Sequence, residues 1–342
     1  MKKVRDSRFE LLRIVSIFMI TLSHFAIYGN WHGLQDISPL ETVKILVLDM
    51  LGPIGAVIFF MITGYFHSRR EFVEKKQKNL VKVRKIWLKT WGYSILMLIV
   101  SILLGLNLSH YVYLKTVLPI LMNEYWFVTC YIVLVILIPY IDLSLERLTE
   151  KQFKELLLIL MLFMFVELVN ADIINRLVLT IFAYSTGFYI NNYSENIIST
   201  WNRKRILSLL AITGGLDILS IYVSRKIGMS FAHSAHFTQY VLPMIIGAIV
   251  IVITIKVTPF RSKIINLYAA SVLPIYLITE NVAFSHYMWA HLLNVGQYQE
   301  SNFFYVVAII ITAILCLVCS SLDIVLSAIF ARINHLLPSR GR

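Results

Sequence analysis

Long apolar runs constrain this chain of 342 residues more than any other feature of its sequence. A helix that spans a bilayer needs about 20 predominantly apolar residues. About ten runs reach or approach that length: residues 9–29, 44–66, 86–106, 126–142, 154–169, 176–190, 205–224, 238–256, 264–284 and 303–330. Only 15% of the residues are charged, whereas a soluble domain has about a quarter. The sequence therefore predicts an all-α, polytopic membrane helical bundle with about ten transmembrane helices.

The distribution of lysine and arginine predicts how these helices are oriented. Basic residues are enriched in the cytoplasmic loops of membrane proteins. With a cytoplasmic N-terminus, 25 of the 31 basic residues lie in inner segments, five in outer segments and Arg13 within a span. This asymmetry predicts that both termini are cytoplasmic, and it explains the net charge of +12 without a nucleic-acid partner. We expect residues 1–342 to form one integral-membrane domain with no appended soluble domain.

The first apolar run contains two residues that a membrane should exclude, Arg13 and His24. Their offset of eleven residues is close to three helical turns, so both side chains lie on one helix face, about 16 Å apart. Ionisable residues inside membrane helices are costly and often functional. Two alternatives explain Arg13 alone, because it is near enough to the inner end to snorkel or to form a structural ion pair with Asp323. Neither alternative explains His24, which lies deeper.

The other acidic residues in or beside the apolar runs fall mainly in the outer half of the predicted bundle. They are Asp49 at the outer start of the second span, Glu124, Glu167, Asp217 and Glu280. Asp49, Glu167 and Asp217 are near enough to span ends to be merely interfacial. Outer-loop histidines at positions 233, 236, 286 and 291 do not have a coherent ligand spacing, so we expect no metal site.

Five motifs occur in order along the chain: FELLRIVSIFMITLSHF (9–25), VIFFMITGYF (57–66), LVKVRKIWLKTW (80–91), NEYWFVTCYIVLVILIPYI (123–141) and ASVLPIYLITENVAF (270–284). On these motifs the chain resembles the integral-membrane acyltransferase-3 family, particularly the exopolysaccharide and capsule O-acetyltransferases of Gram-positive bacteria. The first motif carries the Arg-x10-His spacing of that family. The resemblance covers essentially the whole chain.

The chain departs from the family pattern in two motifs. The basic motif Arg-x-x-Arg is here Lys82-Val83-Arg84-Lys85, and lysine cannot bind a phosphate in the forked geometry of arginine. The histidine that is common in the fifth motif is here Thr279. Glu280 and Asn281 match the motif, but the role of that histidine cannot be transferred to this chain.

The resemblance implies transfer of an acetyl or other acyl group from cytoplasmic acetyl-CoA, a co-substrate, to a hydroxyl of a cell-surface or lipid-linked polysaccharide in the bacterial plasma membrane. His24 is the candidate general base or transient acyl carrier, because imidazole titrates near neutral pH. Arg13 is the candidate that orients the donor, and Glu280 the candidate that holds the imidazole or contacts the acceptor.

The remaining candidates belong to the two substrates. The resemblance assigns Lys82, Arg84 and Lys85, in a predicted loop over residues 67–89, to the phosphates of coenzyme A, although anchoring to anionic membrane lipids is an alternative. On the acceptor side the candidates are Glu124, Tyr125, Trp126 and Asn281, because sugars stack on aromatic rings and hydrogen-bond to carboxylates; an interfacial aromatic belt is the alternative.

Two other functions fit a many-helix protein with such partners. A transporter or flippase for a glycan should show inverted repeats and paired, broken helices, which the sequence lacks. A polysaccharide polymerase should carry large outer loops with several arginines, whereas the outer segments here have five basic residues. The sequence thus favours the acyltransferase.

Overall fold

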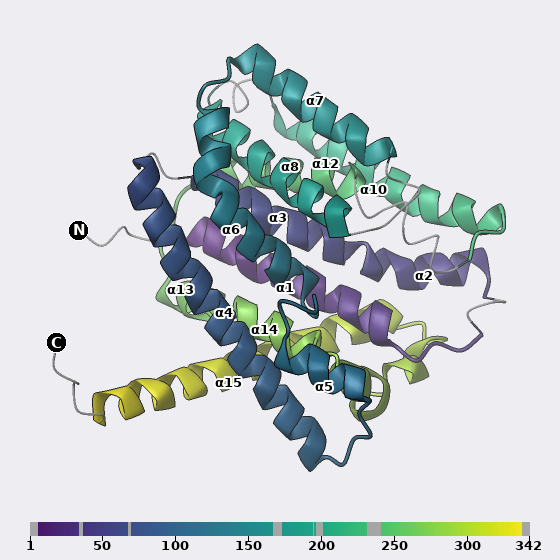
Figure 1. Cartoon of the computed structure of the whole chain (residues 1–342). Helices are drawn as coiled ribbons and strands as arrows, with labels where there is room; N and C mark the ends of the chain where they lie inside the picture. Colours follow the sequence, from purple (N-terminus) through teal and green to yellow (C-terminus); the bar gives the residue numbers. More distant parts are fainter. Residues whose placement is uncertain are drawn as a thin grey trace.

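A computed structural model describes residues 6–33, 37–67, 70–166, 173–193, 195, 201–230 and 241–336. The helices in these ranges, shown in Figure 1, are α1 (Ser7–Tyr28), α2 (Pro39–Asp49), α3 (Leu51–Tyr65), α4 (Phe72–Leu103), α5 (His110–Val117), α6 (Trp126–Leu145), α7 (Glu150–Val166), α8 (Ile173–Asn192), α10 (Arg203–Lys226), α12 (Val241–Lys256), α13 (Lys263–Ala269), α14 (Val272–Thr279) and α15 (Phe304–Leu336). Within the described ranges there is no strand, so the all-α class is confirmed.

Six helical segments of the described chain are long and apolar enough to cross a membrane. They are α1, the α2–α3 segment, α4, α6, α10 and residues 304–329 of α15. Within the described residues each predicted apolar run overlaps a helix, including the shorter α7, α8, α12 and α13–α14. A multi-pass membrane protein is therefore confirmed, while the number of crossings and the side of the termini stay predictions.

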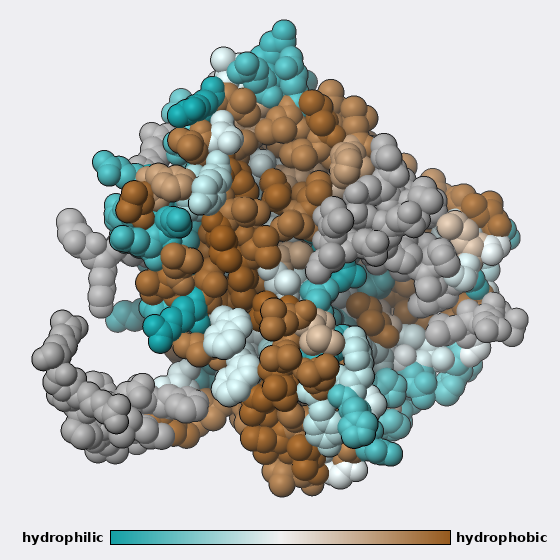
Figure 2. Space-filling view, viewed as in Figure 1, coloured by the Kyte–Doolittle hydropathy of each residue, from teal (hydrophilic) through white to brown (hydrophobic). Residues whose placement is uncertain are grey.

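The outer surface of the bundle has the character that contact with lipid requires. Figure 2 shows hydrophobic side chains over most of one face, including α6, α7 and the lower half of α4. Leu103 at the end of α4 is 81% exposed, and Ile159 and Leu162 on α7 are more than half exposed. Without a hydrocarbon environment such large exposed apolar areas would favour aggregation.

Helix α3 lies between α1 and α8 at the centre of the bundle (Figure 1). Two glycines allow the backbones of α3 and α8 to touch. A Cβ atom on Gly64 would lie 1.9 Å from the carbonyl oxygen of Tyr184, and one on Gly187 would lie 2.0 Å from that of Met61. Small residues at such positions let membrane helices pack closely, where dispersion replaces the missing hydrophobic force.

The second span differs from its prediction. It begins at Pro39, where Ser38 caps the helix, and it breaks at Met50 between α2 and α3. Asp49, which we expected at the outer start of this span, therefore lies at the break in its interior. The stretch before residue 44 is polar, so apolar length does not predict this earlier start, but it contains a complete capping box, which starts a helix despite its low hydropathy.

The predicted basic loop over residues 67–89 is also wrong. Helix α4 begins at Phe72, so Lys82, Arg84 and Lys85 lie on a helix that continues into the membrane span. Lysine, arginine and glutamate are good helix formers, and their charge does not interrupt the backbone hydrogen bonds. The basic residues of α4 show where its apolar span ends, but the helix itself continues beyond them.

Asp323 on α15 is paired, but not with Arg13. Its carboxylate lies 3.0 Å from Lys89 Nζ and accepts a hydrogen bond of 2.8 Å from Ser271 Oγ. Arg13 pairs with Glu10, one turn away on α1, at 2.6 Å. The alternative in which Arg13 and Asp323 form a structural pair is therefore wrong, because both groups have nearer partners.

A second buried ion pair connects α4, α6 and α8. Lys75 Nζ lies 2.7 Å from a carboxylate oxygen of Asp142, and the hydroxyl of Tyr184 donates to the other oxygen at 2.5 Å. Asp142 is completely buried and Lys75 is 5% exposed. Both oxygens of the carboxylate are therefore satisfied inside the bundle.

Removing the lysine should leave this carboxylate buried and unpaired. We expect Lys75→Ala to destabilise the protein by about 3–5 kcal/mol, seen as a lower Tm of the purified protein in detergent. The neighbouring Lys76 is exposed, so Lys76→Ala is the matched control and should change Tm little. Equal Tm values for the two variants would contradict the prediction.

Candidate active site

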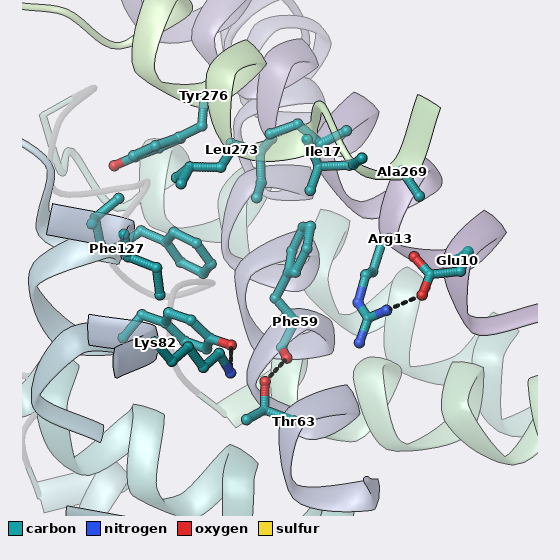
Figure 3. A pocket seen from close by; sticks show the side chains of 16 residues that line it. Glu10, Arg13, Ile17, Phe59, Thr63, Lys82, Phe127, Ala269, Leu273 and Tyr276 are labelled. Atoms are coloured by element: carbon teal, nitrogen blue, oxygen red, sulfur yellow. Dashed lines mark hydrogen bonds and ion pairs between the residues drawn. The ribbon is translucent and has the colours of Figure 1, made fainter. Parts of the chain in front are cut away.

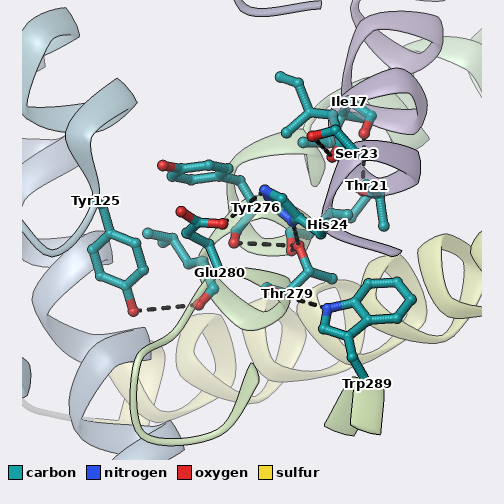
Figure 4. Close-up of polar contacts among 12 residues, drawn as sticks. Ile17, Thr21, Ser23, His24, Tyr125, Tyr276, Thr279, Glu280 and Trp289 are labelled. Carbon is teal, nitrogen blue, oxygen red and sulfur yellow. Dashed lines mark hydrogen bonds and ion pairs between the residues drawn. The ribbon is translucent and has the colours of Figure 1, made fainter. Parts of the chain in front are cut away.

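His24 is buried on α1 and contacts the C-terminal end of α14 (Figure 4). Its Nδ1 lies 3.0 Å from Thr279 Oγ1. The hydroxyl of Thr279 donates its own proton to the carbonyl of Ile275 at 2.9 Å, so towards the imidazole it acts as an acceptor. Nδ1 therefore carries a proton, and the chemistry of this imidazole is assigned to Nε2.

Glu280 faces the other side of the same imidazole. Its Oε2 lies 2.8 Å from His24 Nε2, and the contact has ion-pair distance but not the direction of a regular hydrogen bond. Among the described residues Oε2 has no hydrogen-bond partner. The side chain of Glu280 is 14% exposed and that of His24 is 4% exposed. We call these two residues the dyad; its carboxylate is the more accessible member.

A cavity of about 140 Å³ lies beside the dyad, and we call it the dyad cavity. Its walls include Asp49 from the break between α2 and α3, Trp126 from the start of α6 and Arg176 from the start of α8. The guanidinium carbon of Arg176 lies 4.9 Å from the centroid of the Trp126 ring. The dyad cavity thus combines a base, a second carboxylate, a cation and an aromatic surface.

A larger cavity of about 380 Å³ surrounds Arg13, and we call it the Arg13 cavity (Figure 3). Lys82 from α4 also lines it, and its Nζ donates to the hydroxyl of Tyr131 at 2.6 Å. Arg13 is held by Glu10, but its side chain is 28% exposed. Two positive charges therefore meet at this cavity, although 69 positions separate them in the sequence.

The two cavities meet at three side chains that belong to both. They are Ile20 from α1, Phe127 from α6 and Tyr276 from α14. We call these three residues the junction. The junction residues come from three helices, and Ile20 lies between Arg13 and His24 on α1.

Two of the three basic residues predicted for the donor lie elsewhere. Arg84 and Lys85 are exposed on α4 and line neither cavity, whereas Lys82 lines the Arg13 cavity. Arg84, two positions from Lys82, faces another side of the helix, whereas Lys85, three positions away, is a neighbour of Lys82 on the helix surface that lies outside the cavity lining. The structure therefore brings only the first residue of the basic motif to Arg13.

Three of the four residues predicted for the acceptor lie in a buried network rather than in a cavity. Glu124 Oε1 accepts from Asn281 Nδ2 at 2.9 Å and from the N–H of Val282 at 3.2 Å, and its Oε2 accepts from Ser94 Oγ at 3.2 Å. Asn281 Nδ2 also donates to the hydroxyl of Tyr125 at 2.8 Å. Because Asn281 directly follows the dyad carboxylate, this network fixes the position of that carboxylate. Only Trp126 lines the dyad cavity.

Sequence reasoning missed three residues of this site. Asp49 is predicted at the outer start of the second span and Arg176, at the start of the run 176–190, carries no predicted role, because apolar length alone does not show which end residues turn inward. Tyr276 lies within the fifth motif, but the motif assigns it no role, and it is one of 18 tyrosines in an aromatic-rich chain. A signal for Asp49 was present in the capping box at Ser38, which extends the second span outward.

Some predictions fall outside the described residues or remain untested. Glu167, His233 and His236 lie outside the described ranges. Within those ranges no group of three or more histidine, cysteine, aspartate or glutamate side chains is arranged to hold a metal ion. The expectation of no metal site therefore stays a prediction.

Comparison with protein families gave a match over most of the chain. A family model described as an acyltransferase domain matches residues 6–321. No curated protein and no solved structure gave a match. The matched range contains both cavities, the dyad and the junction, and the family that the five motifs indicated is confirmed.

Glu124 precedes α6, outside the membrane-spanning helices, and burial raises the pKa of its carboxyl from 4.5 to about 7. A carboxyl with a raised pKa binds its proton more tightly in the folded state, so stability falls as pH rises between these two values. We expect Glu124→Gln to remove this dependence, so that the Tm of the variant relative to wild type increases between about pH 5 and about pH 8.

The control for this measurement is Glu300→Gln, because Glu300 is exposed. Thermal unfolding should be followed for all three proteins in the same detergent across the pH range. A Tm difference between Glu124→Gln and wild type that is constant with pH would contradict the assignment.

Proposed function

The chain belongs to the acyltransferase family, and we propose that it is a membrane O-acyltransferase of the bacterial plasma membrane. In this proposal an acetyl group passes from cytoplasmic acetyl-CoA to a hydroxyl of a cell-surface or lipid-linked polysaccharide. The observation that carries the proposal is the meeting of the Arg13 cavity and the dyad cavity at one junction. Family membership also favours the enzyme over the transporter and the polymerase.

The Arg13 cavity suits the donor. Arg13 and Lys82 present two cations to the phosphates of coenzyme A, which carry negative charge. The helical separation of about 16 Å between Arg13 and His24 suits an extended pantetheine arm better than a single compact site. The thioester would then reach the junction while the phosphates stay near Arg13. Arg84 and Lys85, exposed on the same helix, are available to anionic lipids or to the outer part of the donor.

The dyad cavity suits a sugar. Trp126 offers a ring surface, Asp49 accepts hydrogen bonds from hydroxyl groups, and Arg176 donates them. With Asp49 and Arg176 on its walls, the cavity can satisfy a sugar that is rich in hydroxyls without needing a net charge. A hydroxyl placed against the Glu280 carboxylate would face the junction, where the thioester arrives.

The dyad is proposed as a general base rather than as an acyl carrier. Both ring nitrogens of His24 already have contacts, at 3.0 Å to Thr279 and 2.8 Å to Glu280, and the side chain is 4% exposed. A nucleophile needs an accessible nitrogen, whereas in this pair the more exposed Glu280 carboxylate can contact the acceptor hydroxyl. The proton of that hydroxyl is then shared between Nε2 and the carboxylate.

Loss of either dyad member should remove most of the activity. We expect His24→Ala and Glu280→Gln each to lower kcat for acetyl transfer by about 100-fold or more, measured with purified protein, radiolabelled acetyl-CoA and the cell-surface polymer. His110→Ala, an exposed histidine on α5, is the control and should retain activity. Full O-acetylation of the polymer by His24→Ala, seen by NMR at matched expression, would refute the proposed role.

The donor assignment can be tested with a truncated donor. Lys82→Met should raise KM for acetyl-CoA about 10- to 100-fold, because it removes a charge-assisted hydrogen bond to phosphate. The effect should disappear with S-acetylpantetheine, which has no phosphate. The matched control Lys85→Met, on the same helix but outside the cavity, should change KM much less. An equal rise in KM for both donors would contradict phosphate binding by Lys82.

A further inference from the structure

Tyr276 has a buried hydroxyl that the mechanism so far does not use. The residue is 2% exposed, and its oxygen has no regular hydrogen-bond partner among the described residues. Leaving a buried hydroxyl unpaired is costly, so such a group in a folded protein calls for an explanation. Tyr276 is also a junction residue, and its ring centroid lies 5.9 Å from that of His24. The unpaired hydroxyl is thus placed where donor and acceptor would meet.

The N-terminus of α6 is directed at the same place. No side chain caps this helix at Tyr125, and Thr129 is the first residue whose N–H bonds back to the Tyr125 carbonyl, at 2.9 Å. The N–H groups of the preceding turn carry the positive end of the helix dipole. The N–H of Phe127, another junction residue, interacts with the Tyr276 oxygen outside regular hydrogen-bond geometry.

The neighbouring hydroxyls are already occupied. Ser23, on the wall of the dyad cavity, donates to the carbonyl of Ile20 at 2.9 Å, and Thr279 donates to that of Ile275 at 2.9 Å. The proton of Tyr276 has no such acceptor. Among these hydroxyls Tyr276 alone has a proton free to donate at the junction.

We propose that the Tyr276 hydroxyl and the N–H of Phe127 form the oxyanion site of the acyl transfer. This inference rests on the proposed function and assigns a catalytic residue that neither the motifs nor the family match identifies. Preorganised donors that point at a developing negative charge are often the largest single contribution to catalysis. Helix N-termini and tyrosine hydroxyls both serve this purpose.

The acceptor oxygen attacks the thioester carbonyl carbon, a C–O bond forms, and the hydroxyl proton passes to the dyad. The carbonyl electron pair moves onto its oxygen, which accepts hydrogen bonds from Tyr276 and Phe127. Collapse of this tetrahedral intermediate restores the carbonyl and breaks the C–S bond. The coenzyme A thiolate leaves and takes the proton back from the dyad, so that the base is regenerated.

The test is Tyr276→Phe, which removes only the hydroxyl. With both substrates saturating, we expect kcat to fall about 100- to 1,000-fold, while KM for acetyl-CoA and for the acceptor changes by less than about threefold. Because the hydroxyl is unpaired in the resting protein, Tm should stay the same or rise. A purely structural tyrosine would instead show a lower Tm and altered KM values.

The matched control is Thr312→Val on α15. Thr312 is also completely buried with an unpaired hydroxyl, but it lines neither cavity. This variant should keep wild-type kcat and Tm. A kcat of Tyr276→Phe within threefold of wild type would overturn the oxyanion site and leave the proposed function intact. A wild-type protein that transfers no acetyl group from acetyl-CoA would overturn the proposed function, and the oxyanion site with it.

Discussion

The cost of an unpaired polar group in a low-dielectric interior governs how this bundle is arranged. Lys75 and Asp142 are paired, and so are Lys89 and Asp323. Each pair joins helices that are distant in sequence, so the polar groups also fix how the helices pack. Among the buried side-chain atoms that have no hydrogen-bond partner in the described residues, Glu280 Oε2 and the Tyr276 hydroxyl lie at the dyad and the junction. At these two atoms the proposed chemistry gives a reason for the uncompensated cost.

Thr279 shows how a departure from a family motif can keep a function. The hydroxyl of this threonine, the last residue of α14, donates to a carbonyl of the preceding turn, and this fixes its lone pairs toward the imidazole. The threonine thereby defines which nitrogen of His24 carries the proton, and it does so without adding a charge.

The helices and the shared face of Arg13 and His24 could be predicted from the sequence, because both follow from apolar length and the helical repeat. The network of Glu124 and Asn281 could not be predicted. Its partners are 157 positions apart and meet only through tertiary packing. Local charge was also misleading: Lys82 lines a cavity, whereas its helical neighbour Lys85 does not. Depth in the membrane can be read from a sequence, but the direction of a side chain around its helix depends on the neighbours.

The junction has an electrical consequence. If the two cavities open to opposite sides of the membrane, as the predicted depths of Arg13 and His24 imply, the aqueous phases approach each other across Ile20, Phe127 and Tyr276, the described side chains that line both cavities. Most of the membrane potential then falls over these three side chains, and moving one elementary charge through 100 mV changes its energy by about 2.3 kcal/mol. The junction must therefore allow an uncharged acetyl group through while it prevents protons from leaking across the membrane. An apolar junction with a single neutral hydroxyl meets both demands.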